Sequence, residues 1–154
     1  MIMQIIMGFV STICFSIIFN VPRKELFFCG LTGAMGWGVY QFMLLYGNTP
    51  AISALFSTAI ITILSRIFAI RRKMPITVFL IAGIIPLVPG AGIYYTMYDL
   101  FMNELDDAAV KGIGALKMAG VISLGIVLVL SLPISLFNGK IIQSLRSRNT
   151  QKSE

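Results

Sequence analysis

The chain has 154 residues, of which 57% are hydrophobic and only 12% are charged, and its formal net charge is +6. Soluble domains usually carry about 25% charged residues, so this composition excludes an ordinary soluble protein and indicates a single membrane domain. The charges fall in short clusters between apolar runs, which relates them to membrane topology and not to nucleic-acid binding. Histidine is absent, which excludes histidine-based metal sites and Ser/His or Cys/His nucleophile pairs. We therefore expect neither an enzyme nor a cofactor.

Five apolar runs follow one another, and each is close to the roughly 20 residues that a membrane-spanning helix needs. They predict an all-α polytopic membrane protein with five transmembrane helices, over residues 2–19, 26–46, 51–70, 76–97 and 118–137. The predicted domains are a membrane domain over residues 1–140 and a basic cytoplasmic tail over residues 141–154. The polar stretch from Asp99 to Lys117 is expected to connect the last two spans, with Asp99 as the solvated end of the fourth.

The charges of the loops predict the orientation of the chain. Basic residues follow the first, third and fifth runs: Arg23, Lys24, Arg71, Arg72, Lys73, Lys140, Arg146, Arg148 and Lys152. The loop after the second run has no charge, and the stretch after the fourth run begins with an excess of acidic residues. Basic loops stay in the cytoplasm, so we expect the N-terminus outside and the C-terminus inside. A five-span unit of this orientation suits one half of a transporter whose halves have inverted topology, the other half being a separate chain or a second copy.

Prolines and glycines interrupt the fourth run at Ile84-Ile85-Pro86-Leu87-Val88-Pro89-Gly90-Ala91-Gly92. Pro86 and Pro89 each remove a backbone donor and obstruct the preceding helical turn, and Gly90 leaves the backbone free. The fourth helix is therefore predicted to be broken between Pro86 and Gly90. Freed backbone groups are tolerated at membrane depth only beside protein or a water-filled cavity, and in transporters such segments hold substrate or a coupling ion.

The second run is rich in small residues. Gly30, Ala34 and Gly38 recur every four residues and form one stripe, with Gly33 and Gly36 beside it. Such stripes let helices approach closely in lipid, so we predict that this one packs against another span. A direct contact with substrate is the alternative function of these residues.

Three further residues are candidates for the transport pathway, and each has a simpler alternative. Arg66 interrupts the third run, where it either snorkels to the cytoplasmic surface or binds a substrate carboxylate or caps unwound backbone. Tyr94 lies four residues beyond Gly90 and can offer a hydroxyl to a ligand, unless it belongs to an interfacial aromatic belt. Asn20 either ends the first helix or hydrogen-bonds across helices.

Taken together, these motifs resemble the threonine/serine exporter family. The resemblance rests on Phe19-Asn20-Val21-Pro22, the glycines from Gly30 to Gly38, Ser65-Arg66, and Ile85 to Gly90 with Tyr94. It covers nearly the whole chain in order and spacing, and its most specific part is Pro-x-x-Pro-Gly with a tyrosine four residues on. More closely, the chain resembles the family's small five-span subunit, which corresponds to the C-terminal membrane half of a full-length exporter.

The resemblance implies a secondary transporter in a bacterial cell membrane that exports threonine, serine or a related small amino acid or carboxylate, driven by protons. It also implies a larger partner chain with five spans of its own and a cytoplasmic domain. The residues that it assigns to the substrate pathway are Asn20, Arg66, Pro86, Pro89, Gly90 and Tyr94. Because no Asp, Glu or His is expected at mid-membrane, any coupling carboxylate is predicted to lie on the partner. A non-transporting scaffold subunit and a channel for small hydrophilic metabolites stay open as alternatives.

Overall fold

The computed structural model of the protein describes residues 2–132, and these residues form an all-α structure. It contains α1 (Ile2–Ile18), α2 (Leu26–Leu45), α3 (Pro50–Arg72), α4 (Ile76–Ile84), the 3₁₀ turn η1 (Ile85–Leu87), α5 (Gly90–Phe101) and α6 (Leu105–Leu130). The prediction of an all-α fold is confirmed. The predicted basic tail and the end of the predicted fifth span fall on residues 133–154, which lie outside the described residues.

Local sequence explains where α3 begins and ends. Thr49 precedes the helix in extended backbone, and its Oγ1 accepts a hydrogen bond from the Ile52 N–H at 3.4 Å. Pro50 follows at the first helical position, where the missing N–H costs nothing. At the other end Lys73 adopts a left-handed conformation with φ 54°, which ends the helix.

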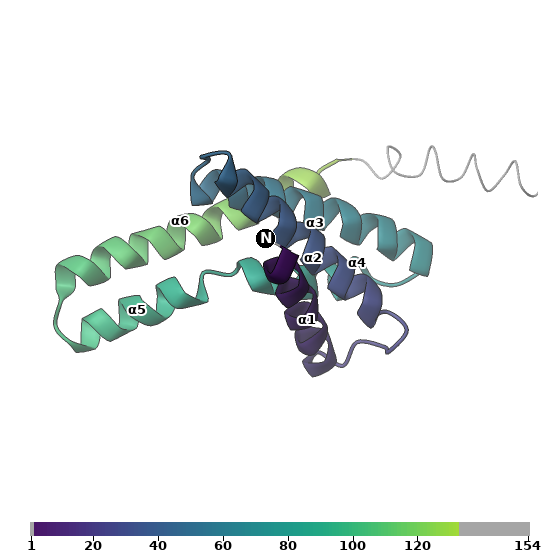
Figure 1. The fold of residues 1–154 in the computed structure, drawn as a ribbon, viewed down its shortest axis with the longest axis horizontal. Helices are drawn as coiled ribbons and strands as arrows, with labels where there is room; N and C mark the ends of the chain where they lie inside the picture. Colours follow the sequence, from purple (N-terminus) through teal and green to yellow (C-terminus); the bar gives the residue numbers. More distant parts are fainter. Residues whose placement is uncertain (1, 133–154) are drawn as a thin grey trace, which may run out of the picture.

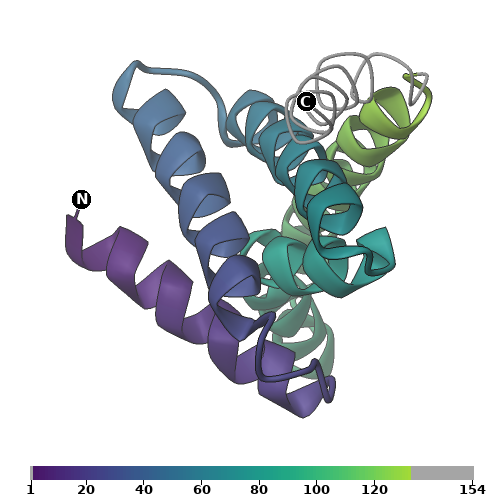
Figure 2. The ribbon, with the colours of Figure 1, turned by 90° about the vertical axis from the view of Figure 1, so that its right-hand side faces the viewer.

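Helices α1 to α4 form a bundle from which the α5–α6 hairpin extends. Within the bundle α1 packs on α2, α2 packs on α3, and α4 lies against both α2 and α3. Figure 1 shows α5 and the first half of α6 reaching beyond the bundle as an antiparallel pair, whereas the second half of α6 returns along α3. In Figure 2 the bundle is in front and this pair lies behind it. The hairpin therefore has few neighbours among the described residues.

Small polar side chains make up much of the bundle core. Eight hydroxyl side chains are fully buried: Thr12, Ser16, Thr32, Ser53, Ser57, Thr58, Thr62 and Ser65. Seven of them donate to the carbonyl four residues earlier in the chain, which satisfies the hydroxyl without a partner helix. Ser57 instead donates to the Gly36 carbonyl of α2 at 2.6 Å. This core brings the helix backbones close together, as is typical of membrane bundles.

The outer surface is apolar, and several helices are suited to a bilayer. By length and composition α3 and α6 can each cross a membrane. A third span is possible if α4 with η1 and the following α5, which are bent by 52°, count as one broken helix. Helix α1 is a shorter apolar helix. Large apolar side chains face outward, including Leu45, Val110, Leu116 and Phe101. The described residues are thus all-helical with two or three candidate membrane spans, which suits a polytopic membrane protein, and the number of five spans stays a prediction.

The stretch from Asp99 to Lys117, predicted to be a connection between spans, is helical instead. Helix α5 continues to Phe101, a short turn contains Asn103 with φ 63°, and α6 begins at Leu105. The acidic residues after the turn occupy the first turn of α6, where the helix dipole favours negative charge. The last helix therefore begins well before the predicted start at residue 118.

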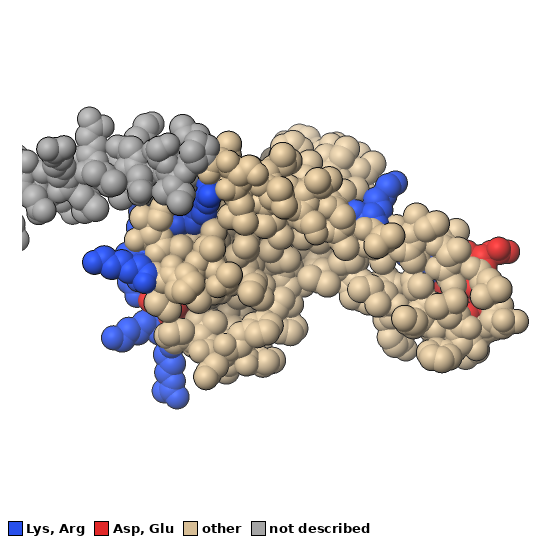
Figure 3. Space-filling model, turned by 180° about the vertical axis from the view of Figure 1, so that it is seen from behind, with Lys and Arg blue, Asp and Glu red and all other residues tan. Residues whose placement is uncertain are grey.

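Charged side chains gather at the two ends of the long axis. Figure 3 shows Lys and Arg at one end of the molecule and acidic side chains at the tip of the α5–α6 hairpin. Hydrogen bonds between Arg72 and Glu25 place the α1–α2 loop beside the end of α3, so their basic residues share one end. The first turn of α6 supplies Asp106 and Asp107 at the other.

Candidate functional site

The predicted break lies between α4 and α5. Val88 is extended (φ −59°, ψ 130°), and Pro89 has φ −75° and ψ 56°. The Gly90 N–H donates to the Val88 carbonyl at 2.7 Å, so Pro89 is the centre of an inverse γ-turn. Proline suits this turn because its ring fixes φ near −65°. The turn separates the two helices, which differ in direction by 52°.

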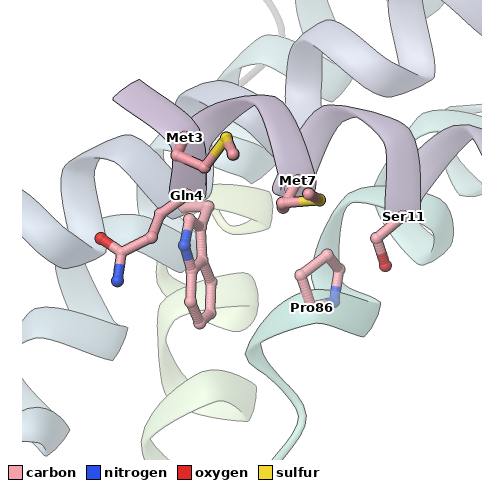
Figure 4. A pocket seen from close by; sticks show the side chains of 7 residues that line it. Met3, Gln4, Met7, Ser11 and Pro86 are labelled. Carbon is pink, nitrogen blue, oxygen red and sulfur yellow. The ribbon is translucent and has the colours of Figure 1, made fainter. Parts of the chain in front are cut away.

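A cavity of about 320 Å³ adjoins the break. Its lining comes from one face of α1, from α2 and from η1: Met3, Gln4, Met7, Gly8, Ser11, Trp37 and Pro86. Figure 4 shows Met7 and Ser11 following one another along α1 with Pro86 opposite them. At Gly8 the absence of a side chain admits the indole, because an added Cβ would lie 3.1 Å from Trp37 Cβ.

The cavity combines an apolar wall with two neutral polar side chains. No charged residue lines it, and within residues 2–132 neither Gln4 nor Ser11 hydrogen-bonds another protein group through its side chain. Their amide and hydroxyl groups are therefore available to a small polar ligand. The part of the chain that the structure describes contains no cluster of residues suited to hold a metal ion.

Of the predicted pathway residues, Pro86 alone lines this cavity. Pro89 and Gly90 follow Pro86 by three and four residues in the chain. A Cβ added at Gly90 would meet no atom within 4 Å. Tyr94 is 65% exposed and points away from the packed side of α5. Its ring lies beside that of Tyr95, with 5.4 Å between the ring centroids. Gly90 and Tyr94 thus face outward from this chain, towards space that substrate, lipid or another chain fills.

Arg66 binds the C-terminal end of α6. Its guanidinium donates to the carbonyls of Val129 at 3.0 Å, Leu130 at 2.9 Å and Leu132 at 2.7 Å. The last carbonyls of a helix lack partners within the helix, so the arginine side chain supplies them. This contact joins α3 to α6 and corresponds to the backbone-capping function considered for Arg66.

Asn20 lies in the turn that ends α1. It has φ 58°, its N–H donates to the Ile17 carbonyl at 3.0 Å, and the Val21 N–H donates to the Ser16 carbonyl at 3.0 Å. This pair of bonds is a Schellman motif, in which asparagine tolerates the left-handed conformation. Asn20 is exposed and does not line the cavity at Pro86.

The small residues of α2 face its neighbours. A Cβ added at Gly30 would come within 2.9 Å of Phe9 and Ile13, and one at Gly33 would overlap Thr12, all on α1. Gly38 faces α1 more loosely, at 3.5 Å from Ile5. Ala34, on the same stripe as Gly30 and Gly38, is buried, and on another face of α2 a Cβ at Gly36 would overlap Ile61 of α3.

Two buried carboxylates were missed by sequence reasoning. Glu25, 6% exposed, accepts hydrogen bonds from Arg72 Nε and Nη2 at 2.8 to 3.1 Å. Asp99, expected to be a solvated span end, is only 3% exposed and lies 2.6 Å from Lys111 Nζ through its Oδ2. The expectation for Asp99 was wrong because α6 continues past it as a helix and covers it. Its spacing of twelve residues from Lys111 gives no signal unless the turn between the helices is known.

The residues of the cavity on α1 did have a signal in the sequence. Gln4 and Ser11 are polar residues in a mostly apolar run, and a separation of seven places them on one helix face. Met7 and Gly8 lie between them on that face. Trp37 could be assigned only once the contact of α1 with α2 was known.

Comparison with known proteins identifies the family. Residues 4–132 match the family model described as "Threonine/Serine exporter, ThrE". A threonine/serine exporter of Corynebacterium glutamicum is 30% identical over 129 residues, which are 81% of this chain and 25% of that protein. An uncharacterized protein of Haemophilus influenzae is 33% identical over 92 residues, 59% of this chain and 31% of that protein. No solved structure matches the chain.

The chain is much shorter than these relatives, since its matches span only 25% and 31% of their lengths. The matching family is one of transporters and not of enzymes, which confirms the class predicted from the sequence. Because the family model covers most of its length, the chain belongs to the threonine/serine exporter family.

Proposed function

We propose that the chain is the membrane subunit of a secondary transporter that exports threonine, serine or a related small amino acid or carboxylate. Family membership and one observation carry the proposal: a cavity with two unengaged polar side chains adjoins a broken helix. In transporters, broken helices bring backbone donors and acceptors to a site near mid-membrane. Pro86, Pro89, Gly90 and the residues of this cavity would form this chain's part of the substrate pathway.

In this proposal α1, α2, α3, the α4–α5 pair and α6 are the five spans. The basic end of the molecule lies in the cytoplasm of a bacterial cell and the acidic hairpin tip lies outside, which follows the positive-inside rule. The membrane domain comprises residues 1–140, and residues 141–154 form a cytoplasmic tail. This orientation directs α5, with Tyr94, from the break towards the outer surface.

A larger partner chain completes the transporter. The match covers only 25% of the length of the Corynebacterium exporter. The outward-facing Gly90 and Tyr94 are suited to face a second chain or the substrate between the two chains. Asn20 and Arg66 are retained as pathway residues in this proposal, although their described contacts are structural.

The experiment measures threonine and serine efflux from the native host after dipeptide feeding. Deleting the gene should raise intracellular threonine or serine, and the intact gene should restore efflux. Ser11→Ala should raise KM roughly 2- to 10-fold, because a neutral hydrogen bond contributes about 0.5–1.5 kcal/mol. Ser123→Ala is the matched control, since that hydroxyl is exposed and donates to its own helix.

Gly90→Leu gives a second test of the pathway. A Cβ added there meets no atom of the described residues within 4 Å, so we expect the variant to insert normally into the membrane and yet lose efflux. Normal efflux from Gly90→Leu would remove the break from the pathway. Unchanged threonine and serine accumulation in the deletion strain would instead support the scaffold, and efflux without counterflow of labelled substrate would support a channel.

A further inference from the structure

The buried carboxylate in the α5–α6 hairpin is the starting point. Asp99 is 3% exposed, and its Oδ2 lies 2.6 Å from Lys111 Nζ. Within the described residues this oxygen has no hydrogen bond of good geometry, so the ion contact is its one compensation for burial. The lysine side chain is 42% exposed, which leaves it a direct route to solvent.

The pair differs from Glu25, the other carboxylate that is buried within the described residues, in how firmly the cation holds the carboxylate. Glu25 is held by two nitrogens of Arg72, whose guanidinium also lies over the Phe28 ring at 4.8 Å. A planar, permanently charged fork of this kind fixes a carboxylate in place. A lysine ammonium is instead a point charge on a flexible stem, and it can leave without breaking a two-point contact.

The charged and titratable groups around Asp99 come from the hairpin itself, because α6 is the main helix packed against α5. Across from Asp99, α6 presents Lys111, and the charges of Glu104 and Asp107 act on that lysine. On α5 itself, the Tyr95 ring lies 5.9 Å from Lys111 Nζ. The lysine thus has other acidic residues near it on the side of the solvent. Within the described residues, no second cation forms an ion pair with the carboxylate of Asp99.

We propose that Asp99 is a proton-binding residue of the transport cycle and that Lys111 is its exchangeable counter-ion. The inference rests on the proposed function and places a coupling carboxylate on this chain, where sequence reasoning had expected it on the partner. A proton from the outer side adds to an oxygen of Asp99 and gives the neutral acid, and no other bond changes. The ammonium of Lys111, deprived of its counter-ion, turns to solvent and to the acidic residues at the hairpin tip.

Protonation of Asp99 also has a route to the substrate cavity. Helix α5 is continuous from Gly90 to Phe101, so a change in its packing on α6 reaches the break at Pro89. The chain has one tryptophan, Trp37, which lines the cavity together with Pro86. Tryptophan emission therefore reports on the cavity without any added label.

The first measurement follows Trp37 emission of the full chain in lipid nanodiscs while the pH is lowered through the range in which carboxylates titrate. The wild-type protein should show one transition, Asp99→Asn should show none, and Asp107→Asn, at an exposed acid of the same hairpin, should keep it. A wild-type trace without a transition overturns the proposal. An Asp99→Asn trace that matches the wild type does so as well.

The second measurement uses chromosomal variants in the native host, which keeps any partner chain present. Asp99→Asn should lose the stimulation of threonine efflux by a pH gradient and keep exchange of labelled for unlabelled threonine. The double variant Asp99→Asn with Lys111→Met removes both charges, which is well tolerated by folds, and should behave in the same way. Restored gradient-driven efflux in the double variant would make the pair purely structural and overturn the proposal.

Loss of exchange together with efflux, at normal protein levels, would also overturn it. If the wild-type host transports neither threonine nor serine, the proposed function fails. The Trp37 titration still decides in that case whether Asp99 binds a proton, so the two failures are distinguishable.

Discussion

Replacing Gly33 by alanine tests how closely α1 and α2 pack. A Cβ at this position would overlap Thr12 Oγ1 and lie 2.7 Å from Thr12 Cβ and 2.9 Å from Thr12 Cγ2. Thr12 is fully buried, and its hydroxyl donates to the Gly8 carbonyl at 2.7 Å. The threonine therefore cannot turn away without losing that bond, and its Cβ cannot move unless α1 moves.

The expected loss of stability follows from three contributions. Overpacking a core costs about 1–3 kcal/mol, and loss of the Thr12 hydrogen bond costs about 0.5–1.5 kcal/mol. Alanine is about 1 kcal/mol better than glycine within a helix, which offsets part of this. Gly33→Ala should therefore lower the free energy of unfolding by roughly 0.5–3.5 kcal/mol.

Unfolding in detergent micelles, followed by circular dichroism, measures this difference. Gly120→Ala is the matched control, because an added Cβ there meets no atom within 4 Å, and it should be neutral or stabilising by up to about 1 kcal/mol. Adding Thr12→Ala to Gly33→Ala should recover part of the loss. If Gly33→Ala is as stable as Gly120→Ala, the described contact between α1 and α2 is wrong.

Three further predictions concern the other contacts between helices, and unfolding in the same detergent measures all of them. Arg66→Lys should be more destabilising than Arg71→Lys, because a lysine cannot serve the three carbonyls that the guanidinium binds, whereas Arg71 is exposed; equal effects would contradict the capping of α6. Arg72→Met should destabilise more than the double variant with Glu25→Met, since the buried Glu25 carboxylate is left unpaired only in the former; additive effects would argue against the ion pair. Ser57→Ala should cost about 0.6 kcal/mol, the mean for hydrogen bonds between membrane helices, and no cost would mean that its bond to α2 contributes nothing.

Much of the fold could be predicted because its signals act locally. The predicted run of residues 2–19 is close to α1 (Ile2–Ile18), and the run of residues 26–46 is close to α2 (Leu26–Leu45). The break falls between Pro86 and Gly90 because proline and glycine act on their own backbone, whatever surrounds them. Polar residues at the hairpin tip misled the prediction, because polarity indicates exposure to water and not the absence of a helix.

The site was less predictable because its contacts join distant parts of the chain. The contacts of Arg66 with the end of α6 span more than sixty positions, and nothing near Arg66 in the sequence indicates them. Burial of Asp99 depends on the turn at Asn103 folding α6 back over α5. The cavity needs α1 beside η1, so the pattern of Gln4 and Ser11 is informative only after the helices are assembled.

The inverse γ-turn at Pro89 has a mechanical consequence. It joins α5 to η1, and so to α4, through Val88 and Pro89, so α5 can act as a lever arm about a hinge at this point. Twelve helical residues extend about 18 Å, so a rotation of about 10° moves the far end by about 3 Å while the near end hardly shifts. Small changes at the hinge are therefore enlarged at the far end of α5. The broken helix is thus built so that α5 can swing while α4 stays packed in the bundle.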